Sequence, residues 1–295
     1  MTPAPKVHIA TTTWNCVDII DRFLDHHRRL GVHRVLVIDY HSDDGTRDVL
    51  ASPRWKDFVE MSDLRSLAGQ DTSQEMLGTL RERHPGDWAL FCDPDEFLVT
   101  PDMRVADLLP AEGGVESVAI PRFNMTAPRS LADHGELETA ALDHMRLRIC
   151  QQHRRTPAER RSMALDPPWI YTAIMDKTLV RLDAALSIGI GDHAARTRSG
   201  IAAARSTDGY FLHFPIRSYR NFEEKVHLYR LDYEANPGQP GWHQHRWIKL
   251  LDAGTLREEY LAQFVDDEQL EALLAAGVVQ PEDGLSRVAR EPRDA

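Results

Sequence analysis

At the start of the chain, the pattern of hydrophobic and polar positions changes from that of a strand to that of a helix and back to that of a strand. Residues 7–13 are rich in β-branched side chains, which favour a strand. Apolar residues then recur at the spacing of a one-sided helix over residues 20–30, with Asn15 and Asp18 as possible N-caps. The apolar run 34–38 is typical of a strand covered on both faces. Together these segments predict a βαβ unit with two parallel strands.

The same alternation continues to about residue 100. We expect a short helix over residues 46–50, a strand over 58–61, a helix over 72–83 and a buried strand over 88–92. Strands that alternate with helices form a parallel or mixed sheet with helices on its faces. The first hundred residues therefore predict an α/β fold of the Rossmann-like, nucleotide-binding kind.

The second half of the chain has a mixed pattern. Strands are expected over residues 116–123, 177–181 and 210–214. A helix is expected over 221–234, capped by Asn221 with Glu224 three residues on. The polar stretch 131–168 reads as a long insertion, either placed over a site or partly mobile.

Composition and charge narrow the function classes. The chain has 295 residues, 42% of them hydrophobic, which is enough for a globular core, and its formal net charge is −11. So acidic a protein is a poor candidate for binding nucleic acid or an anionic membrane. Its apolar runs are too short for a transmembrane segment, and a strand pattern starts too early for a signal peptide. Cys16, Cys92 and Cys150 are widely spaced, so we expect a cytoplasmic protein.

The acidic motif after the strand at 88–92 is the strongest chemical feature. Asp93, Asp95 and Glu96 bring three carboxylates together within four residues. Such carboxylates repel one another unless a positive charge offsets them, and carboxylate oxygens suit Mg²⁺ or Mn²⁺. Strand alternation would place Asp93 and Asp95 on one side and Glu96 on the other. The alternative is a solvated Asp-Pro-Asp turn.

Two further groups of residues stand at predicted strand ends. Asp39 and Asp44 follow the strand at 34–38, where ligands of open α/β sheets bind, although an acidic capping loop is an equal alternative. His213 ends the strand at 210–214 and could complete a metal site begun by two aspartates, although a lone strand histidine is more often a core residue. The glycine-rich dinucleotide fingerprint, the P-loop and the serine-hydrolase elbow are absent.

The order of these motifs resembles the GT-A glycosyltransferases, in their family 2-like and family 92-like branch. The resemblance covers roughly residues 6–230. It is carried by the segments Thr13-Trp-Asn15, Leu30-Gly31-Val32, Val37-Ile-Asp39, Ser42-Asp-Asp-Gly-Thr46, Phe91-Cys-Asp-Pro-Asp-Glu-Phe-Leu98, His213, Arg217-Ser218 and Lys225.

The resemblance implies a metal-dependent transfer of a sugar from a UDP- or GDP-linked donor to a sugar, glycoconjugate or small-molecule acceptor. It implies Mn²⁺ or Mg²⁺ held by Asp93, Asp95 and His213, and Glu96 that orients the site or touches the donor sugar. It also implies a GT-A domain over 1–235, with a nucleotide-binding half (1–100) and an acceptor-side half (101–235), and a helical C-terminal extension over 236–295. The residues expected to contact the donor are Thr12, Trp14, Asp39, Asp44 and Gln74.

An inverting transfer would also need a general base within reach of the acceptor hydroxyl. Asp192 or His193 is our choice, while Asp166 and Glu136 are alternatives. Polysaccharide biosynthesis is one expected setting for such a transfer. Two other functions stay open: a metal-dependent nucleotidyl- or phosphotransferase, and a non-catalytic module that binds a nucleotide or a sugar.

Overall fold

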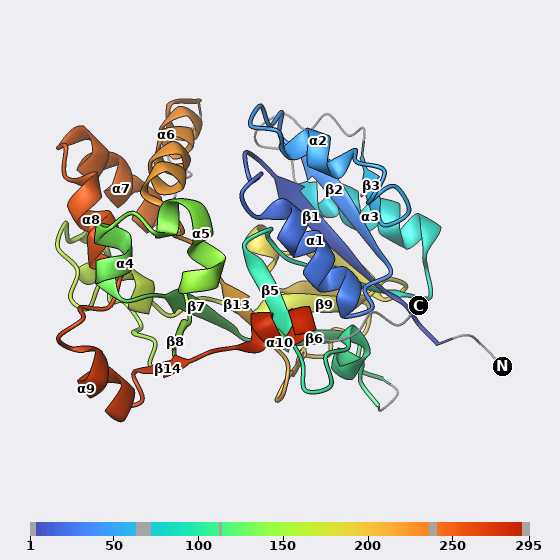
Figure 1. The fold of residues 1–295 in the computed structure, drawn as a ribbon. Helices are drawn as coiled ribbons and strands as arrows, with labels where there is room; N and C mark the ends of the chain where they lie inside the picture. The colour runs from blue at the N-terminus through green and yellow to red at the C-terminus, as the bar shows by residue number, and fades with distance from the viewer. Residues whose placement is uncertain (1–3, 63–71, 112–113, 236–240, 291–295) are drawn as a thin grey trace. The chain divides into compact units, whose positions relative to one another are not determined.

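The computed structural model describes residues 4–62, 72–111, 114–235 and 241–290. The chain divides into two compact units, each built from separate stretches of sequence. Unit 1 comprises residues 1–122, 175–212 and 284–295, and unit 2 comprises residues 123–174 and 213–283. Figure 1 labels their helices and strands.

Unit 1 is an α/β unit, as predicted. Its strands are β1 (Val7–Thr13), β2 (Arg34–Asp39), β3 (Val59–Met61), β4 (Trp88–Phe91), β5 (Glu96–Val99), β6 (Ser117–Ile120), β9 (Lys177–Arg181), β10 (Ala185–Ile188), β11 (Ala195–Thr197), β12 (Ala204–Arg205) and β13 (Tyr210–His213). Its helices are α1 (Ile20–Arg29), α2 (Thr46–Leu50), α3 (Thr72–Arg83), α10 (Gly284–Arg290) and the short 3₁₀ turns η1 (Val105–Leu108) and η4 (Ile190–Asp192).

A seven-stranded mixed sheet organises unit 1. Its strand order is β12-β6-β9-β4-β1-β2-β3. The strands β4, β1, β2 and β3 are parallel, whereas β9 runs antiparallel between β4 and β6. This arrangement brings the amino end of β9 to the carboxyl end of β4. Residues that are far apart in sequence therefore meet at one edge of the sheet.

Alternating residues of the central strands pack against helices on the two faces of the sheet. On one face, Met76, Leu77 and Leu80 of α3 are buried against a cluster that includes Ala10 and Phe91. Burying each such side chain contributes roughly 1.5–3 kcal/mol. The helix α1 covers the face of β1 turned toward the viewer in Figure 1.

Unit 2 is mainly helical. Its helices are α4 (Arg129–Asp133), α5 (Leu137–His144), α6 (Tyr219–Ala235), α7 (Trp242–Asp252), α8 (Leu256–Ala262) and α9 (Leu270–Ala275), with the 3₁₀ turns η2 (Glu159–Arg161) and η3 (Trp169–Tyr171). Its strand β8 (Leu147–Ile149) pairs antiparallel with β7 (Arg122–Thr126) and β14 (Val279–Pro281). The predicted insertion 131–168 belongs to this unit. None of the helices in the described ranges has the length and apolar character that a membrane span requires.

Three local predictions differ from the structure. The single strand expected over 116–123 is two strands, because Pro121 lacks the N–H that would continue the ladder. The helix α6 begins at Tyr219, and the Ser218 hydroxyl accepts the N–H of Asn221 at 3.0 Å, so the cap is Ser218. Helix α1 has no side-chain cap, since Asn15 instead pairs with Asp43.

Candidate functional site

The acidic motif lies in the turn between β4 and β5. The N–H of Glu96 donates to the carbonyl of Asp93 at 3.0 Å, which closes the turn. The Glu96 carboxylate in turn accepts the N–H of Asp93 at 2.9 Å, and Glu96 is fully buried. The alternation expected for a continuous strand is therefore wrong, because the chain turns here and Glu96 lies beside Asp93.

A buried lysine holds this turn together. Lys177, at the start of β9, is 1% exposed, and its ammonium lies 2.8 Å from Asp93, 3.5 Å from Glu96 and 3.9 Å from Asp192. Its position follows from the antiparallel register, which pairs Thr178 with Phe91 and so places Lys177 beside the end of β4. One ammonium is thus shared by three carboxylates.

Arg122 is the second cation of this cluster. Its guanidinium forms an ion pair with Glu96 and donates to the carbonyl of Met175 at 2.7 Å. Arg122 is the first residue of β7 and comes two positions after the end of β6, which lies beside β9. We did not foresee Lys177 and Arg122 from the sequence. The sequence does contain one feature that could have pointed to Lys177, which is a basic residue directly at the start of an apolar strand, Lys177-Thr-Leu-Val.

The electrostatics of the cluster favour an ionised Asp93 next to a charged Lys177, whereas burial raises the pKa of Glu96 above its ordinary value. Burial acts to raise the pKa of Asp93, but the Lys177 ammonium outweighs it, so the pKa lies below its ordinary value. Burial alone would lower the pKa of Lys177, but Asp93 and Glu96 raise it above its ordinary value. Asp95 is 8% exposed and acts on Asp93 as a like charge. The predicted pair Asp93 and Asp95 therefore lies in one cluster.

The loop after β10 adds Asp192 and His193 to the same region. Asp192 has a positive φ of 63° and accepts a hydrogen bond of 2.6 Å from the Ser73 hydroxyl of α3. His193 lies 3.1 Å from the carbonyl of Asp176 through its Nδ1, and burial lowers its pKa to about 4. A cavity of about 430 Å³ opens beside His193 and is lined mostly by small residues such as Ala119.

Gln74, a predicted donor contact, has a structural role in the same region. Its side-chain amide donates to the carbonyl of Ile188 at 2.9 Å and so anchors α3 to the end of β10. Gln74 therefore borders the loop that carries Asp192 and His193.

The loops after β1 and β2 are joined at the carboxyl edge of the sheet. The Asp39 carboxylate accepts hydrogen bonds from Thr13 at 2.9 Å and from the Ser42 hydroxyl at 2.6 Å. Asp44 accepts the N–H of Val17 at 2.9 Å. These bonds fix both loops at the edge where ligands of open α/β sheets bind.

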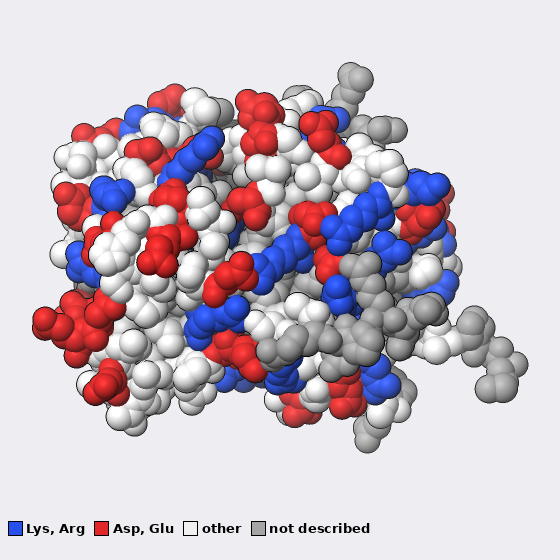
Figure 2. Space-filling model, in the orientation of Figure 1, with Lys and Arg blue, Asp and Glu red and all other residues white. Residues whose placement is uncertain are grey.

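The other predicted donor contacts lie at the same edge. Thr12 is the penultimate residue of β1 and Trp14 directly follows this strand, and both side chains are partly exposed. The structure therefore brings Thr12, Trp14, Asp39 and Asp44 to one rim. Figure 2 shows acidic and basic side chains interspersed over one face of the molecule.

His213 is the last residue of β13, and the boundary between the units falls directly before it, so that His213 is assigned to unit 2. Its Nδ1 lies 2.7 Å from the Asn124 side-chain oxygen, and the residue is 9% exposed. Its role as a metal ligand stays a prediction.

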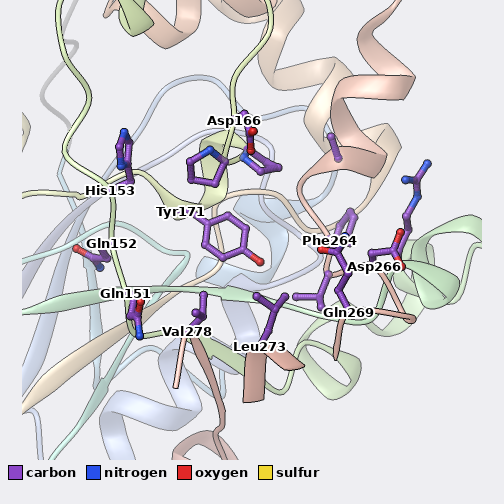
Figure 3. A pocket seen from close by; sticks show the side chains of 15 residues that line it. Gln151, Gln152, His153, Asp166, Tyr171, Phe264, Asp266, Gln269, Leu273 and Val278 are labelled. Atoms are coloured by element: carbon purple, nitrogen blue, oxygen red, sulfur yellow. The ribbon is translucent and has the colours of Figure 1, made fainter. Parts of the chain in front are cut away.

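Unit 2 has a cavity of its own, of about 540 Å³ (Figure 3). Tyr171 is 8% exposed and directs its hydroxyl into this cavity, and no hydrogen bond to that hydroxyl is formed within the described ranges. The walls combine amide, ionisable and apolar side chains, among them Gln151, Gln152, Gln269, Arg129, His153, Asp166, Asp266, Phe264, Leu273 and Val278. Planar polar groups beside aromatic and aliphatic surface suit a hydroxyl-rich ligand.

Comparisons with known proteins found distant likenesses only. No protein-family model and no curated protein sequence matches the chain. Among solved structures, the mannosyltransferase PcManGT from Pyrobaculum calidifontis, in complex with GDP-Man and Mn²⁺, is similar with 18% identity, a TM-score of 0.41 and coverage of 98% of this chain and 79% of that one.

Two further solved structures are similar at the same level. TarS 1–349 from S. aureus, in complex with UDP, has 15% identity, a TM-score of 0.42 and coverage of 92% and 79%. Glucosyl-3-phosphoglycerate synthase from Mycobacterium tuberculosis, with Mn²⁺ and UDP, has 13% identity, a TM-score of 0.38 and coverage of 81% and 82%. Likenesses this distant carry no argument about activity, so the function is inferred from the site itself.

Proposed function

We propose that the protein is a metal-dependent glycosyltransferase of the GT-A type. It would move a sugar from a UDP- or GDP-linked donor to a glycan or small-molecule acceptor. The observation that carries this proposal is the acidic cluster at the carboxyl end of β4, where Asp93, Glu96 and Asp192 share the Lys177 ammonium. The cluster stands at the ligand-binding edge of an α/β sheet, beside the joined loops after β1 and β2.

The donor atoms of this cluster fit Mn²⁺ or Mg²⁺. Asp93 and Asp95 offer carboxylate oxygens only, and such ions are commonly held by one or two carboxylates together with substrate phosphates. Asp93 would bind the ion through Oδ1, because the Lys177 ammonium lies within hydrogen-bond distance of Oδ2 only. A bound ion would neutralise the charge that develops on the departing nucleoside diphosphate. His213 is our proposed third ligand, from the resemblance alone.

The remaining residues take separate roles in this proposal. Glu96 is a positioning residue, because it is fully buried and holds the backbone of Asp93. Asp192 is the proposed general base of an inverting transfer, since Ser73 fixes its side chain beside the cluster. His193 is the second choice, because its Nδ1 already lies 3.1 Å from the Asp176 carbonyl and only Nε2 is left for an acceptor hydroxyl.

For the donor nucleotide, we propose contacts with Thr12, Trp14, Asp39, Asp44 and Gln74. The joined loops after β1 and β2 support this proposal because they hold most of these residues at one rim. For the acceptor, we propose residues 101–235. The cavity around Tyr171 supports this assignment, because its amide and aromatic lining fits sugar hydroxyls and ring faces. Thiol cysteines at positions 16, 92 and 150 fit our proposal of a cytoplasmic enzyme, for example in polysaccharide synthesis.

Calorimetry on the full chain tests this proposal. UDP and GDP are each titrated with and without Mn²⁺, and we expect binding that requires the metal. Equal binding without Mn²⁺ would contradict the proposal and favour a non-catalytic nucleotide-binding module. Product analysis with UDP- and GDP-sugars then separates the enzyme classes. Release of UDP or GDP with sugar transfer supports the proposal, whereas release of pyrophosphate indicates a nucleotidyltransferase.

A further inference from the structure

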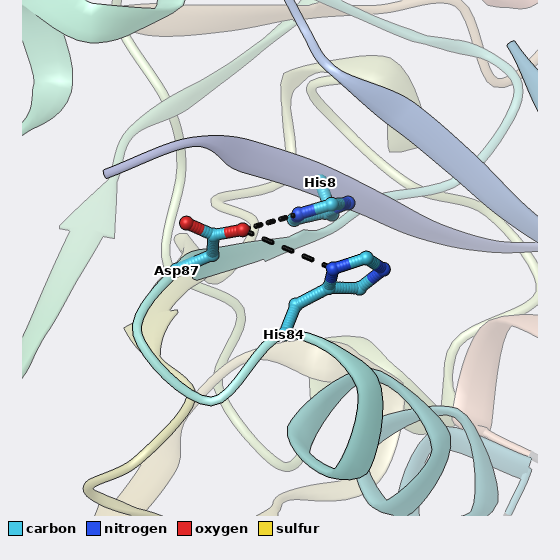
Figure 4. A group of neighbouring side chains, drawn as sticks. All are labelled: His8, His84 and Asp87. Carbon is cyan, nitrogen blue, oxygen red and sulfur yellow. Dashed lines mark hydrogen bonds and ion pairs between the residues drawn. The ribbon is translucent and has the colours of Figure 1, made fainter. Parts of the chain in front are cut away.

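A second group of potential metal ligands lies at the opposite edge of the sheet in unit 1. His8 is the second residue of β1, His84 follows α3, and Asp87 directly precedes β4 (Figure 4). The parallel register pairs Val7 with Trp88, so the start of β1 lies beside the turn that carries Asp87. Asp93 comes six positions after Asp87, which is about 20 Å along an extended strand. The group is therefore separate from the acidic cluster.

The three side chains direct ligand atoms toward one point. The Asp87 Oδ2 lies 2.9 Å from His8 Nε2 and 4.0 Å from His84 Nδ1. One ligand atom from each residue lies within 4.8 Å of the others. The two imidazole rings are stacked, with centroids 4.1 Å apart and an interplanar angle of 23°, and His8 Nε2 and His84 Nδ1 both face the Asp87 carboxylate (Figure 4). Small side-chain adjustments would bring all three atoms to metal-ligand distances of about 2.0–2.2 Å from one ion.

The surroundings hold these residues in the form that binds a metal. His8 is fully buried, which favours the neutral imidazole that a metal-ligand bond requires. The Lys6 backbone N–H donates to the Asp87 Oδ1 at 2.9 Å. That bond orients the carboxylate and leaves Oδ2 directed at the two imidazoles, as the hydrogen-bond partners of metal ligands commonly do.

Hydrogen bonding alone does not account for the burial of His8. The residue is fully buried, yet its Nδ1 has no hydrogen-bond partner within the described residues. A metal on Nε2 would place the ring proton on Nδ1, where an unpaired N–H is unfavourable. Coordination by several protein ligands stabilises a fold by more than one such unpaired N–H costs.

We infer that His8, His84 and Asp87 form a binding site for Zn²⁺ or a similar transition-metal ion, with water as a fourth ligand. Two imidazoles and one carboxylate favour Zn²⁺, Co²⁺ or Ni²⁺ over the harder Mn²⁺ and Mg²⁺. The ion would join the start of β1 to the turn before the neighbouring strand β4. Its role is to stabilise unit 1, at a distance from the transfer chemistry.

Cobalt substitution tests this site directly. The full chain is freed of metal with EDTA and titrated with Co²⁺, and the visible absorption of the ion is recorded. We expect one equivalent to give the intense bands of tetrahedral Co²⁺ with nitrogen ligands. We also expect Zn²⁺ to raise the melting temperature by several degrees, because a ligand stabilises the state that it binds. Weak octahedral bands with no thermal shift would overturn the site.

Matched variants separate this site from other histidines and from the acidic cluster. His84→Ala should abolish both the bands and the zinc-dependent thermal shift, and its partial exposure makes folding without it feasible. His33→Ala is the control, because His33 contacts the His8 ring edge-on but is no member of the ligand set. Asp95→Asn should keep the bands. Equal bands in His84→Ala, or their loss in His33→Ala or Asp95→Asn, would contradict the assignment.

Discussion

The Lys177 ammonium lies 2.8 Å from the Asp93 carboxylate, although the two residues are 84 positions apart in the chain. The contact exists because β9 runs antiparallel to β4, so that one strand begins where the other ends. It places a permanent cation inside the acidic turn. The turn is therefore held in shape before any ligand binds, which reduces the reorganisation that binding would require.

Replacing Lys177 tests how much this contact stabilises the fold. Lys177→Met leaves three carboxylates around an apolar side chain, and breaking a buried ion pair from one side typically costs about 3–5 kcal/mol. We expect a loss of that size in urea unfolding. Lys56→Met, at an exposed position of unit 1, should change the stability little. Equal stability of the two variants would show that Lys177 does not compensate the cluster.

Asp95 is expected to act through metal and nucleotide binding. Asp95→Asn keeps the shape of the side chain but removes one charged metal ligand. We expect Mn²⁺-dependent UDP or GDP binding to weaken by tenfold or more and donor turnover to fall by about 10²-fold or more, with little change in melting temperature. Asp57→Asn, on the surface of the same unit, is the control. Full donor turnover by Asp95→Asn in saturating Mn²⁺ would show that Asp95 is not a metal ligand.

The general base can be distinguished by comparing two variants. Asp192→Asn should lower kcat by about 10²–10⁴-fold while nucleotide binding is kept, because a positioned base contributes by that factor. His193→Gln should reduce kcat less, because a neighbour that is not the base affects kcat only through the position of Asp192. Single-turnover kinetics at saturating donor measure both effects. A larger loss of kcat in His193→Gln than in Asp192→Asn would assign the role of general base to His193.

Gly191 has no side chain and so leaves room for the His193 imidazole. It has a φ of +70°, and an added Cβ would lie 2.8 Å from the Nε2 of His193. Gly191→Ala should therefore displace the imidazole and lower activity. Gly200→Ala is a matched control, because Gly200 has a φ of +66° with nothing within 4 Å of an added Cβ. Both variants bear the left-handed penalty of about 1–2 kcal/mol. If they lose the same activity, the contact with His193 is irrelevant.

Two buried histidines of α1 make the fold sensitive to acid. Burial lowers the pKa of His26 to about 4 and lowers that of His27 as well, against about 6.5 in the unfolded chain. Their contribution to stability is present above pH 6.5 and is lost as the pH falls toward 4, because the unfolded state takes up the protons. The shift at His26 corresponds to about 3 kcal/mol.

Urea unfolding of the metal-free protein at several pH values measures this effect. We expect the free energy of unfolding to fall between pH 6.5 and 4. His26→Gln keeps an amide donor for the Leu98 carbonyl and should flatten the dependence by about one proton. His134→Gln, at an exposed position, should leave the slope as it is. An unchanged slope in His26→Gln would refute the assignment to His26.

Local sequence patterns determined most of the elements of unit 1. The predicted bounds of β1, α2, α3 and β9 agree with the structure. These elements follow from residue spacing and from breakers such as Gly31 and Pro85, which act within a few positions of the chain. The acidic motif at the end of β4 was visible for the same reason, because its carboxylates are neighbours in sequence.

Tertiary structure alone decided what surrounds these carboxylates. Lys177 and Arg122 reach them through strands paired with distant partners, and no local period encodes such pairing. Glu96 lies beside Asp93 because the chain turns there, whereas alternation holds only within a strand. His8, His84 and Asp87 likewise meet through the register of β1 and β4. Spacing along a chain encodes local conformation, but packing between elements decides which side chains share a site.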